Sequence, residues 1–574
     1  MNDLRPELIA AIATRLYRQA TDTTAPALPP PPVMNDAIND ARAARAPSSL
    51  PAGLPEIAPA VVPAANPTVL PDNAAGADPQ AGLRAFVRQV RFGGVATSDV
   101  PGSREPMPAR PCQAPGGDDG LTRAVAALRA AAASQPYDGG QSSDSSLRGP
   151  GFLTRSGLPA SHLPGSAALD VETIRRDFPA LRQTVHGKPL IWMDNAATTQ
   201  KPQAVIDAVS RFYTRDNSNI HRAAHALAAR ATDAYERARE QVRAFLNASA
   251  AREIVFVRGT TEGINWVANV FGRSRLGDGD EILLTTLEHH ANIVPWQMVA
   301  RATGARIRVV PVNDRGEVLL DEYQRLLGPR TRLVGLVHAC NSLGTILPVE
   351  EMTRMAKQQG ARVLIDGAQS VAHIPVNVQE LGCDFYVFSG HKLFGPTGIG
   401  AVYATPELLD GLPPWQGGGN MIRDVTFEHT TYADPPARFE AGTPNIADAV
   451  GLGAAIEYVQ RIGLSTIARH EHALLRQATE GLSAIPGLRL IGTAAHKVGV
   501  LSFVLDGHSP EEIGKRLDRE GIAVRAGHHC AQPSLRRFGV EATVRPSLAV
   551  YNTHGEVEKL IEALRNMRRS PTTI

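Results

Sequence analysis

The stretch Asp384-Phe-Tyr-Val-Phe-Ser-Gly-His-Lys-Leu-Phe-Gly-Pro-Thr-Gly398 decides how this chain folds. Its apolar run, residues 385–388, predicts a strand buried on both faces. The glycines that follow predict tight backbone just beyond the strand end. Lys392 therefore leaves the end of a buried sheet, where a lysine with a lowered pKa can form a Schiff base. Taken alone, the same pattern is also typical of a solvated loop lysine.

A second apolar strand ends in a carboxylate shortly before this stretch. It reads Val363-Leu-Ile-Asp366-Gly-Ala-Gln369. A pyridoxal phosphate (PLP) site needs a lysine for the Schiff base and a partner for the pyridinium nitrogen of the cofactor. Lys392 and Asp366 fit these two roles, so the two strands together predict a PLP site.

Helical and strand patterns alternate through residues 169–455. Such alternation predicts an α/β fold with a mostly parallel sheet covered on both faces. Ligands of these sheets bind beyond the carboxyl ends of the strands, where His338, Asn341, Asp366 and Lys392 lie. Residues 456–574 predict a smaller α+β domain. The expected elements are helices 171–181, 203–214, 226–247, 261–271, 292–303, 321–327, 350–359, 466–484, 509–519 and 555–567, and strands 189–193, 253–257, 281–286, 306–310, 332–337, 362–365, 384–388, 499–505 and 522–525.

Composition excludes several classes of protein. The net charge of +2 over 574 residues gives no electrostatic reason to expect nucleic acid, and no apolar run is long enough to expect a membrane span. Four dispersed cysteines without a Cys-x-x-Cys pair favour a reducing compartment. We expect no metal site, because the adjacent pairs His289-His290 and His528-His529 cannot each converge on one ion.

The first 168 residues differ from the rest of the chain. They contain more than half of the 43 prolines and none of the four tryptophans, so we expect this extension to be largely disordered. Three apolar islands, at 4–20, 81–94 and 121–133, are interpreted either as transient helices or as motifs that fold on a partner. Recurring Asp and Glu disfavour a transit peptide.

Residues 169–574 resemble PLP-dependent cysteine desulfurases of the sulfur-mobilisation (Suf) type, in the class V aminotransferase and selenocysteine lyase family. The resemblance implies a type I PLP fold like that of aspartate aminotransferase, L-cysteine as substrate and a homodimer. The motifs that carry it are Asp194-Asn-Ala-Ala-Thr-Thr199, Arg258-Gly-Thr-Thr-Glu-Gly-Ile-Asn265, Glu288-His-His-Ala-Asn292, Asp366-Gly-Ala-Gln369, Ser389-Gly-His-Lys392, Ala441-Gly-Thr-Pro-Asn445 and Arg525-Ala-Gly-His-His-Cys530.

The motif Arg258-Gly-Thr-Thr261 lies between a predicted strand and a predicted helix. Its backbone N–H groups would attract an anion, although an ordinary threonine cap is the alternative. The resemblance implies that this motif binds the cofactor phosphate and implies further cofactor contacts. These are Thr260, Thr261, Ser389 and His391 at the phosphate, Thr443 reaching a phosphate across a dimer interface, His289 stacked on the ring and moving protons, Gln369 at the phenolic oxygen, and Asn341 near the ring or the substrate carboxylate.

Cys530 has histidines and an arginine close by in the sequence, and positive neighbours raise the thiolate fraction of a cysteine. A lone cysteine is more often an inert buried residue, but the glycine and histidine context favours an exposed loop. The resemblance implies that Cys530 takes the sulfur of cysteine as a persulfide, with Arg545 and Arg525 binding the substrate carboxylate. The short segment from Cys530 to Arg545 resembles desulfurases that pass sulfur to a dedicated acceptor protein.

The extension at residues 1–168 is absent from ordinary desulfurases of this type. In composition and position it resembles the disordered cargo domain of desulfurases packed inside encapsulin nanocompartments, which predicts a cytoplasmic protein held within such a shell. The alternatives are a selenocysteine lyase or another PLP lyase, a free cytosolic desulfurase that feeds iron–sulfur cluster assembly, and a shell-bound protein with a vestigial enzyme fold. Intact Asp366, Lys392 and Cys530 argue against the last.

Overall fold

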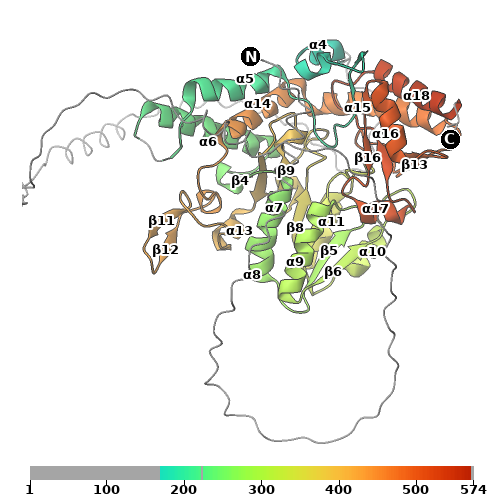
Figure 1. Cartoon of the computed structure of the whole chain (residues 1–574). Helices are drawn as coiled ribbons and strands as arrows, with labels where there is room; N and C mark the ends of the chain where they lie inside the picture. The colour runs from blue at the N-terminus through green and yellow to red at the C-terminus, as the bar shows by residue number, and fades with distance from the viewer. Residues whose placement is uncertain (1–168, 222–223, 570–574) are drawn as a thin grey trace, which may run out of the picture. The chain divides into compact units, whose positions relative to one another are not determined.

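A seven-stranded sheet organises the computed structural model, which describes residues 169–221 and 224–569 (Figure 1). The strand order is β4-β10-β9-β8-β7-β5-β6. β10 runs antiparallel to its two neighbours, and the pairs from β9 to β6 are parallel, as the sequence predicted. The strands are β4 (Ile254–Val257), β5 (Glu281–Thr285), β6 (Arg306–Val310), β7 (Thr331–Val337), β8 (Arg362–Asp366), β9 (Phe385–Ser389) and β10 (Gly400–Ala404).

Helices cover both faces of this sheet, which explains why its central strands are apolar throughout. Phe385 and Val387 of β9 pack into the cluster on one face, with side chains of α7 (Thr260–Val267) and α9 (Val294–Thr303). Tyr386 and Phe388 point the other way, into the cluster that contains α6 (Ala226–Leu246), α11 (Val349–Gln358) and α14 (Ile446–Ile462). Adjacent residues of one strand therefore serve two cores.

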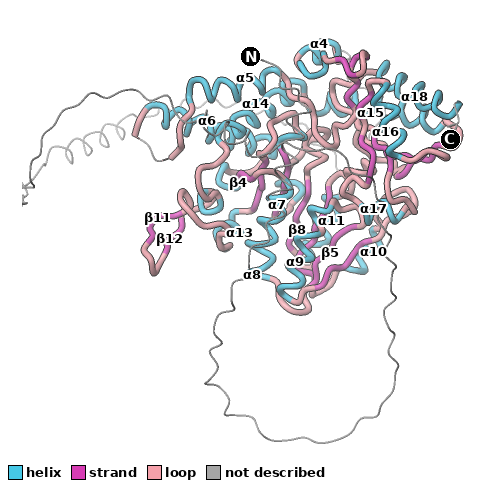
Figure 2. Tube along the Cα trace, viewed as in Figure 1, coloured by secondary structure: helices cyan, strands magenta, loops and turns pink. Residues whose placement is uncertain are grey.

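A four-stranded sheet carries the C-terminal part of the chain. Its strands, in order, are β13 (Leu488–Ile491), β14 (Ser502–Leu505), β17 (Thr543–Arg545) and β16 (Arg525–Gly527). The sheet packs on α15 (Leu464–Ser483), α16 (Pro510–Arg519) and α18 (His554–Arg569) around a separate apolar cluster (Figure 2). The short β3 (Ile191–Trp192) pairs in parallel with β15 (Ile522–Ala523) and so belongs to this part. The predicted domain boundary at 455/456 falls inside the continuous helix α14.

Several elements differ from the expectations. The predicted helix 261–271 is α-helical only to Val267, and residues Ala268–Gly272 form a π-helical turn. The predicted strand 522–525 divides into β15 and β16 (Arg525–Gly527). Neither β10 nor the hairpin of β11 (Ile422–Val425) and β12 (Thr430–Tyr432) was predicted from the sequence. β10 follows directly on a glycine-rich segment, and the hairpin strands are short and carry polar residues.

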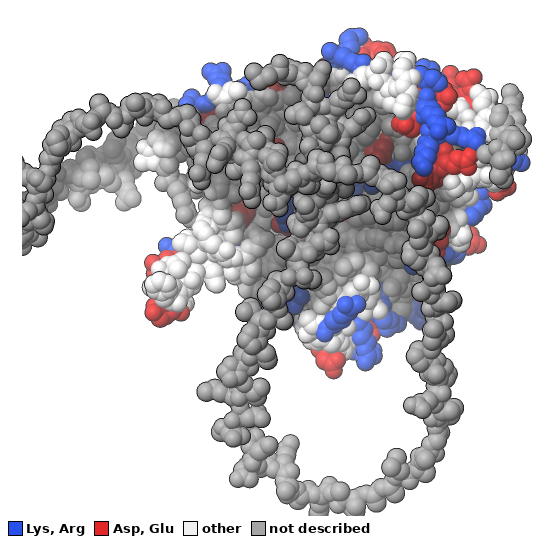
Figure 3. Space-filling view, in the orientation of Figure 1, with Lys and Arg blue, Asp and Glu red and all other residues white. Residues whose placement is uncertain are grey.

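The other helices are α4 (Val171–Arg176), α5 (Gln203–Arg211), α8 (Arg273–Arg275), α10 (Leu320–Leu326), α12 (Val378–Leu381), α13 (Pro406–Gly411) and α17 (Gln532–Arg537), and the other strands are β1 (Thr184–Val185), β2 (Lys188–Pro189), β13 (Leu488–Ile491), β14 (Ser502–Leu505) and β17 (Thr543–Arg545). Among the described residues, no helix has the length and apolar character needed to cross a bilayer. Charged side chains of both signs are interspersed near α16 and α18 (Figure 3). The predicted disorder of residues 1–168 and the apolar islands lie outside the described residues.

Candidate active site

A cavity of about 550 Å³ lies at the carboxyl ends of β7, β8 and β9. The position agrees with the rule that open α/β sheets bind ligands beyond their carboxyl edge. The structure brings twelve of the predicted site residues together in its lining, namely Thr260, Thr261, His289, Asn341, Asp366, Gln369, Ser389, His391, Lys392, Arg525, Cys530 and Arg545. Thr443 lies elsewhere and is described below.

The start of α7 and the end of β9 form a hydroxyl-lined cradle. The backbone N–H of Thr260 donates to Ser389 Oγ at 2.8 Å, and the Thr260 hydroxyl is also 2.8 Å from that atom. Gly259 precedes the helix at φ 151°, and a Cβ there would lie 3.0 Å from Ser389 Oγ. Only glycine fits this approach. A helix start beside two hydroxyls suits a phosphate.

Lys392 and Asp366 line the same cavity from neighbouring strands. Lys392 ends a 3₁₀ turn, Gly390–Lys392, that follows β9 directly. Burial lowers the pKa of Lys392 to about 8, and the charge of Asp366 opposes this change. Burial raises the pKa of the Asp366 carboxyl. The hydrogen bond from the Ala368 N–H and the charge of Lys392 act in the opposite direction. A lysine that loses its proton near neutral pH is a competent Schiff-base former.

The carbonyl of His391 is held by a cluster of donors that the sequence analysis did not identify. It accepts the backbone N–H of Thr199 at 3.0 Å and the hydroxyls of Thr198 and Thr199, each at 3.1 Å. Lys201 Nζ lies 3.3 Å from the same oxygen, and burial lowers the pKa of this lysine to about 8. Because His391 directly precedes Lys392, these donors fix the turn that presents the reactive amine.

His289 is held as one neutral tautomer. Burial, together with the charges of Lys392 and His290, lowers its pKa to about 3, and its Nδ1 accepts the Ala291 N–H at 3.0 Å. The proton therefore sits on Nε2. The preceding residue, Glu288, is fully buried and accepts bonds from Thr285 Oγ1 (2.6 Å), Asn292 Nδ2 (2.7 Å) and the Val337 N–H (3.0 Å). These bonds anchor the His289 turn to β5 and β7.

Two amides at the cavity wall are oriented by backbone carbonyls. Gln369 Nε2 donates to the carbonyl of Ala196 at 2.6 Å, and Asn341 Nδ2 donates to that of His529 at 2.7 Å. Asn341 Oδ1 is buried and has no hydrogen-bond partner among the described residues. An orphaned buried oxygen is costly, so this atom is available to a donor on a ligand.

Two arginines of the C-terminal sheet, Arg525 and Arg545, share the carboxylate of Asp194. Arg525 and Arg545 face each other across β16 and β17, an unfavourable like-charge pairing. Asp194 relieves it, with Oδ1 3.3 Å from Arg545 Nη2 and Oδ2 3.6 Å from Arg525 Nη1. Arg545 is buried and its Nε has no partner among the described residues. The pair suits recognition of a second carboxylate.

Cys530 projects from a strained loop that begins after β16. Both His529 and Cys530 adopt left-handed backbone, at φ 54° and 53°, which non-glycine residues rarely do. The loop is tied down because the His290 N–H donates to the Cys530 carbonyl at 2.8 Å and the Cys530 N–H donates to His528 Nδ1 at 3.1 Å. Cys530 is partly exposed, whereas Cys340 and Cys383 are buried.

Thr443 lines a different cavity, of about 610 Å³, together with Arg258 and Trp415. The turn that carries it is anchored by the buried Glu440, whose carboxylate accepts Arg239 Nη1 at 2.6 Å and the Phe256 N–H at 2.8 Å. Within one chain, Thr443 therefore does not line the Lys392 cavity.

The residues at this site fit pyridoxal phosphate. The hydroxyl cradle at Thr260 and Ser389 matches its phosphate, Asp366 matches its ring nitrogen, and Lys392 matches its aldehyde. The orphaned oxygen of Asn341 and the orphaned nitrogen of Arg545 are groups that a bound molecule would satisfy.

Comparisons with known proteins agree with this geometry. Residues 191–560 match the family Aminotransferase class-V. A cysteine desulfurase of Synechococcus elongatus is 64% identical over 419 residues, which are 72% of this chain and 67% of that protein. A cysteine desulfurase of Dickeya dadantii is 49% identical over 412 residues, 72% of this chain and 98% of that protein. The structure of the Escherichia coli cysteine desulfurase CsdA, in an S-sulfonic acid form, is 40% identical, covers 70% of this chain and 99% of its own, and has a TM-score of 0.66.

The chain therefore belongs to the class V aminotransferase family. Within that family it is a cysteine desulfurase, an enzyme that uses pyridoxal phosphate.

Proposed function

We propose that Cys530 takes the sulfur of L-cysteine as a persulfide and that alanine is the second product. The observation that carries this proposal is the position of Cys530. Its thiol is partly exposed on a loop that lines the same cavity as Lys392, Asp366 and Arg545. The three groups supply an amine, an acid and a carboxylate anchor, and Cys530 adds the only thiol in the cavity lining among the described residues.

The side chains have separate tasks in this proposal. Arg545, with Arg525 beside it, binds the substrate carboxylate, and Asn341 Oδ1 accepts a hydrogen bond. When bound, pyridoxal phosphate supplies the electron sink for the α-carbon of the substrate. Lys392, whose pKa of about 8 keeps part of it as free amine at neutral pH, moves the α-proton. His289, which carries its proton on Nε2, is the hydrogen-bond donor to the bound molecule. The Cys530 thiolate forms an S–S bond with the substrate sulfur as the C–S bond breaks, and the electron pair remains on the carbon that becomes alanine.

The test combines two products. Wild-type enzyme incubated with L-cysteine should form alanine and a persulfide on Cys530, detected by mass spectrometry of the alkylated peptide. Cys530→Ala should lose both while retaining bound cofactor, and Cys383→Ala, which changes a buried thiol, should retain the persulfide. Alanine formation at the wild-type rate by Cys530→Ala would refute the role of Cys530. Selenide release from selenocysteine by the same variant would favour the selenocysteine lyase alternative.

We also propose a homodimer in which Thr443 completes the phosphate site of the partner subunit. This proposal is supported by the separate cavity at Thr443 and by apolar side chains exposed around it and on the β11–β12 hairpin, with Phe427 fully exposed and Trp415 39% exposed. Sedimentation should give a dimer, and Thr443→Val should weaken cofactor binding without loss of dimer. A monomer with full cofactor affinity would refute it.

A third proposal concerns residues 1–168, which we expect to dock on the inner wall of an encapsulin shell through the islands at 4–20 and 81–94. It is supported by the proline-rich composition of residues 1–168 as a whole and by the Synechococcus relative, which also has residues outside the matched 67% of its length. Deleting residues 1–168 should leave desulfurase activity but abolish co-purification with the shell. Equal encapsulation of the truncated chain would refute the proposal.

We propose a dedicated acceptor protein of the Suf type for the persulfide. Only α17 lies between the Cys530 loop and β17, the strand that ends at Arg545, so the thiol is held close to the cavity by a short segment. Sulfide release to added dithiothreitol should therefore be slow and should rise when the acceptor is supplied. Equal rates with and without acceptor would contradict this.

A further inference from the structure

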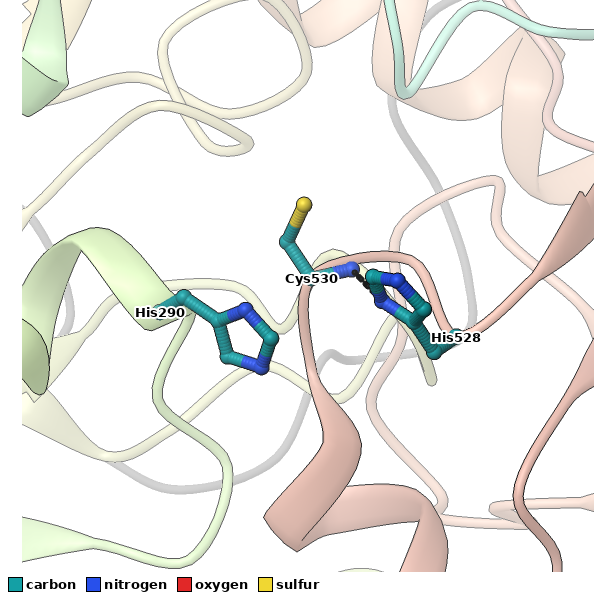
Figure 4. Close-up of side chains that lie close together, drawn as sticks. All are labelled: His290, His528 and Cys530. Atoms are coloured by element: carbon teal, nitrogen blue, oxygen red, sulfur yellow. Dashed lines mark hydrogen bonds between the residues drawn. The ribbon is translucent and has the colours of Figure 1, made fainter. Parts of the chain in front are cut away.

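One histidine from each adjacent pair lies beside Cys530. His290 begins the turn His290–Asn292, and His528 belongs to the loop after β16. One candidate ligand atom of each of His290, His528 and Cys530 lies within 4.8 Å of the other two (Figure 4). The two rings stack, with centroids 5.8 Å apart and 25° between their planes. The two histidines of one pair cannot converge on one ion, whereas the residues that do converge come from two segments that meet only in the fold.

A thiolate with two imidazoles is a donor set that zinc prefers. Zinc bonds of about 2.0–2.3 Å place such donors closer together than 4.8 Å, so the three side chains must close in by rotation. Cys530 has freedom to do so, because it is partly exposed and Figure 4 shows its Sγ pointing away from the rings. His528 Nδ1 accepts the Cys530 N–H, and His290 Nε2 accepts the Gln532 N–H at 3.2 Å. An ion bound through those nitrogens would displace these bonds.

We propose that Cys530, His290 and His528 form a three-ligand site for a soft divalent cation, with Zn²⁺ the best match and a fourth position open to an outside ligand. Binding exchanges the thiol proton for the metal, so one proton is released as the sulfur–zinc bond forms. If Cys530 accepts sulfur as proposed above, metal occupancy and sulfur acceptance exclude each other, because both need the same lone pairs. The site would then act as an inhibitory metal sensor at the reactive thiol.

Equilibrium dialysis of the full-length enzyme, loaded with cofactor, against ZnSO₄ without cysteine tests the site. One zinc per chain should bind, and Cys530→Ser should lose it. His528→Gln and His290→Gln should each raise the dissociation constant about tenfold or more. His472→Gln, which alters an exposed histidine on α15, should bind as wild type does. Zinc retained by Cys530→Ser at wild-type stoichiometry would overturn the proposal.

A second measurement needs no substitution. Alkylation of Cys530 by iodoacetamide, followed by peptide mass spectrometry, should slow about tenfold at saturating Zn²⁺ and recover when a chelator is added. The buried Cys340 and Cys383 serve as internal references. An alkylation rate that zinc does not change would overturn the site. Neither readout uses desulfuration, so failure here leaves the role of Cys530 in sulfur transfer intact, and loss of persulfide formation alone would not affect the metal result.

Discussion

Replacing Glu288 with glutamine should change how stability depends on pH. Glu288 is fully buried beneath the His289 turn, where it accepts bonds from Thr285, Asn292 and Val337. Burial raises its pKa from 4.5 to about 7, although all three bonds oppose the change. Glutamine has nearly the same shape and no charge, so Glu288→Gln isolates the ionisation of this one group.

The magnitude follows from the difference between the folded and unfolded pKa. Below pH 4.5 Glu288 is protonated in both the folded and the unfolded state, and the folded state carries no penalty for it. As the pH rises from 4.5 toward 7, the unfolded chain loses this proton more readily than the folded protein, and the free energy of unfolding falls. A change from 4.5 to about 7 corresponds to about 3 kcal/mol at about 1.4 kcal/mol for each unit. Above pH 7, the free energy of unfolding of the wild-type protein has therefore fallen by that amount relative to that of the glutamine variant.

Urea unfolding at pH 5 and pH 8, with cofactor concentration held constant, measures the effect. The free-energy difference between Glu288→Gln and wild type should shift by about 2.5 kcal/mol in favour of the variant from pH 5 to pH 8, because part of the full change has already occurred at pH 5. Glu350→Gln, at an exposed site on α11, should show no comparable shift. A shift below about 1 kcal/mol would mean that the carboxylate is better solvated than its burial implies.

Four further substitutions test separate features. Lys392→Ala should abolish alanine formation and prevent borohydride from fixing the cofactor to the chain, measured by mass spectrometry. Lys201→Met, which removes the ammonium beside the His391 carbonyl, should lower kcat about tenfold or more at near-wild-type melting temperature. Gly367→Ala places a Cβ 2.3 Å from the Tyr386 ring and should cost about 1–3 kcal/mol in urea unfolding. Arg239→Met strands the buried Glu440 carboxylate and should cost about 3–5 kcal/mol.

The sequence was sufficient to predict the fold class and the cavity because both depend on local patterns. Buried strands such as 362–366 and 385–389 are largely apolar runs, and the predicted site residues Asp366 and Lys392 lie at or just beyond their ends. β10 was not predicted, since it lies in a glycine-rich segment and is defined only by its antiparallel pairing with β4 and β9.

The residues missed at the site act through partners distant in the sequence. Lys201 and Thr199 are unremarkable in a loop, and only the fold brings them to the His391 carbonyl. Asp194 was quoted as part of a motif, but its pairing with Arg525 and Arg545 depends on the C-terminal sheet. Glu288 lies two residues beyond the predicted strand 281–286 and directly before the predicted stacking histidine, and a charged residue at that position was the signal available in the sequence.

The facing arginines on β16 and β17 have a consequence for which amino acids the proposed site would select. Arg525, Arg545 and the thiol loop all belong to the same small sheet and its connections, so in the proposed mechanism this sheet would set the distance between the carboxylate-binding arginines and Cys530. Lys392 and Asp366, by contrast, lie at the ends of strands of the seven-stranded sheet. Because the thiol loop also accepts hydrogen bonds from His290 and Asn341, this distance would be held from both sheets, and it would favour an amino acid whose side chain is long enough to bring its sulfur to Cys530.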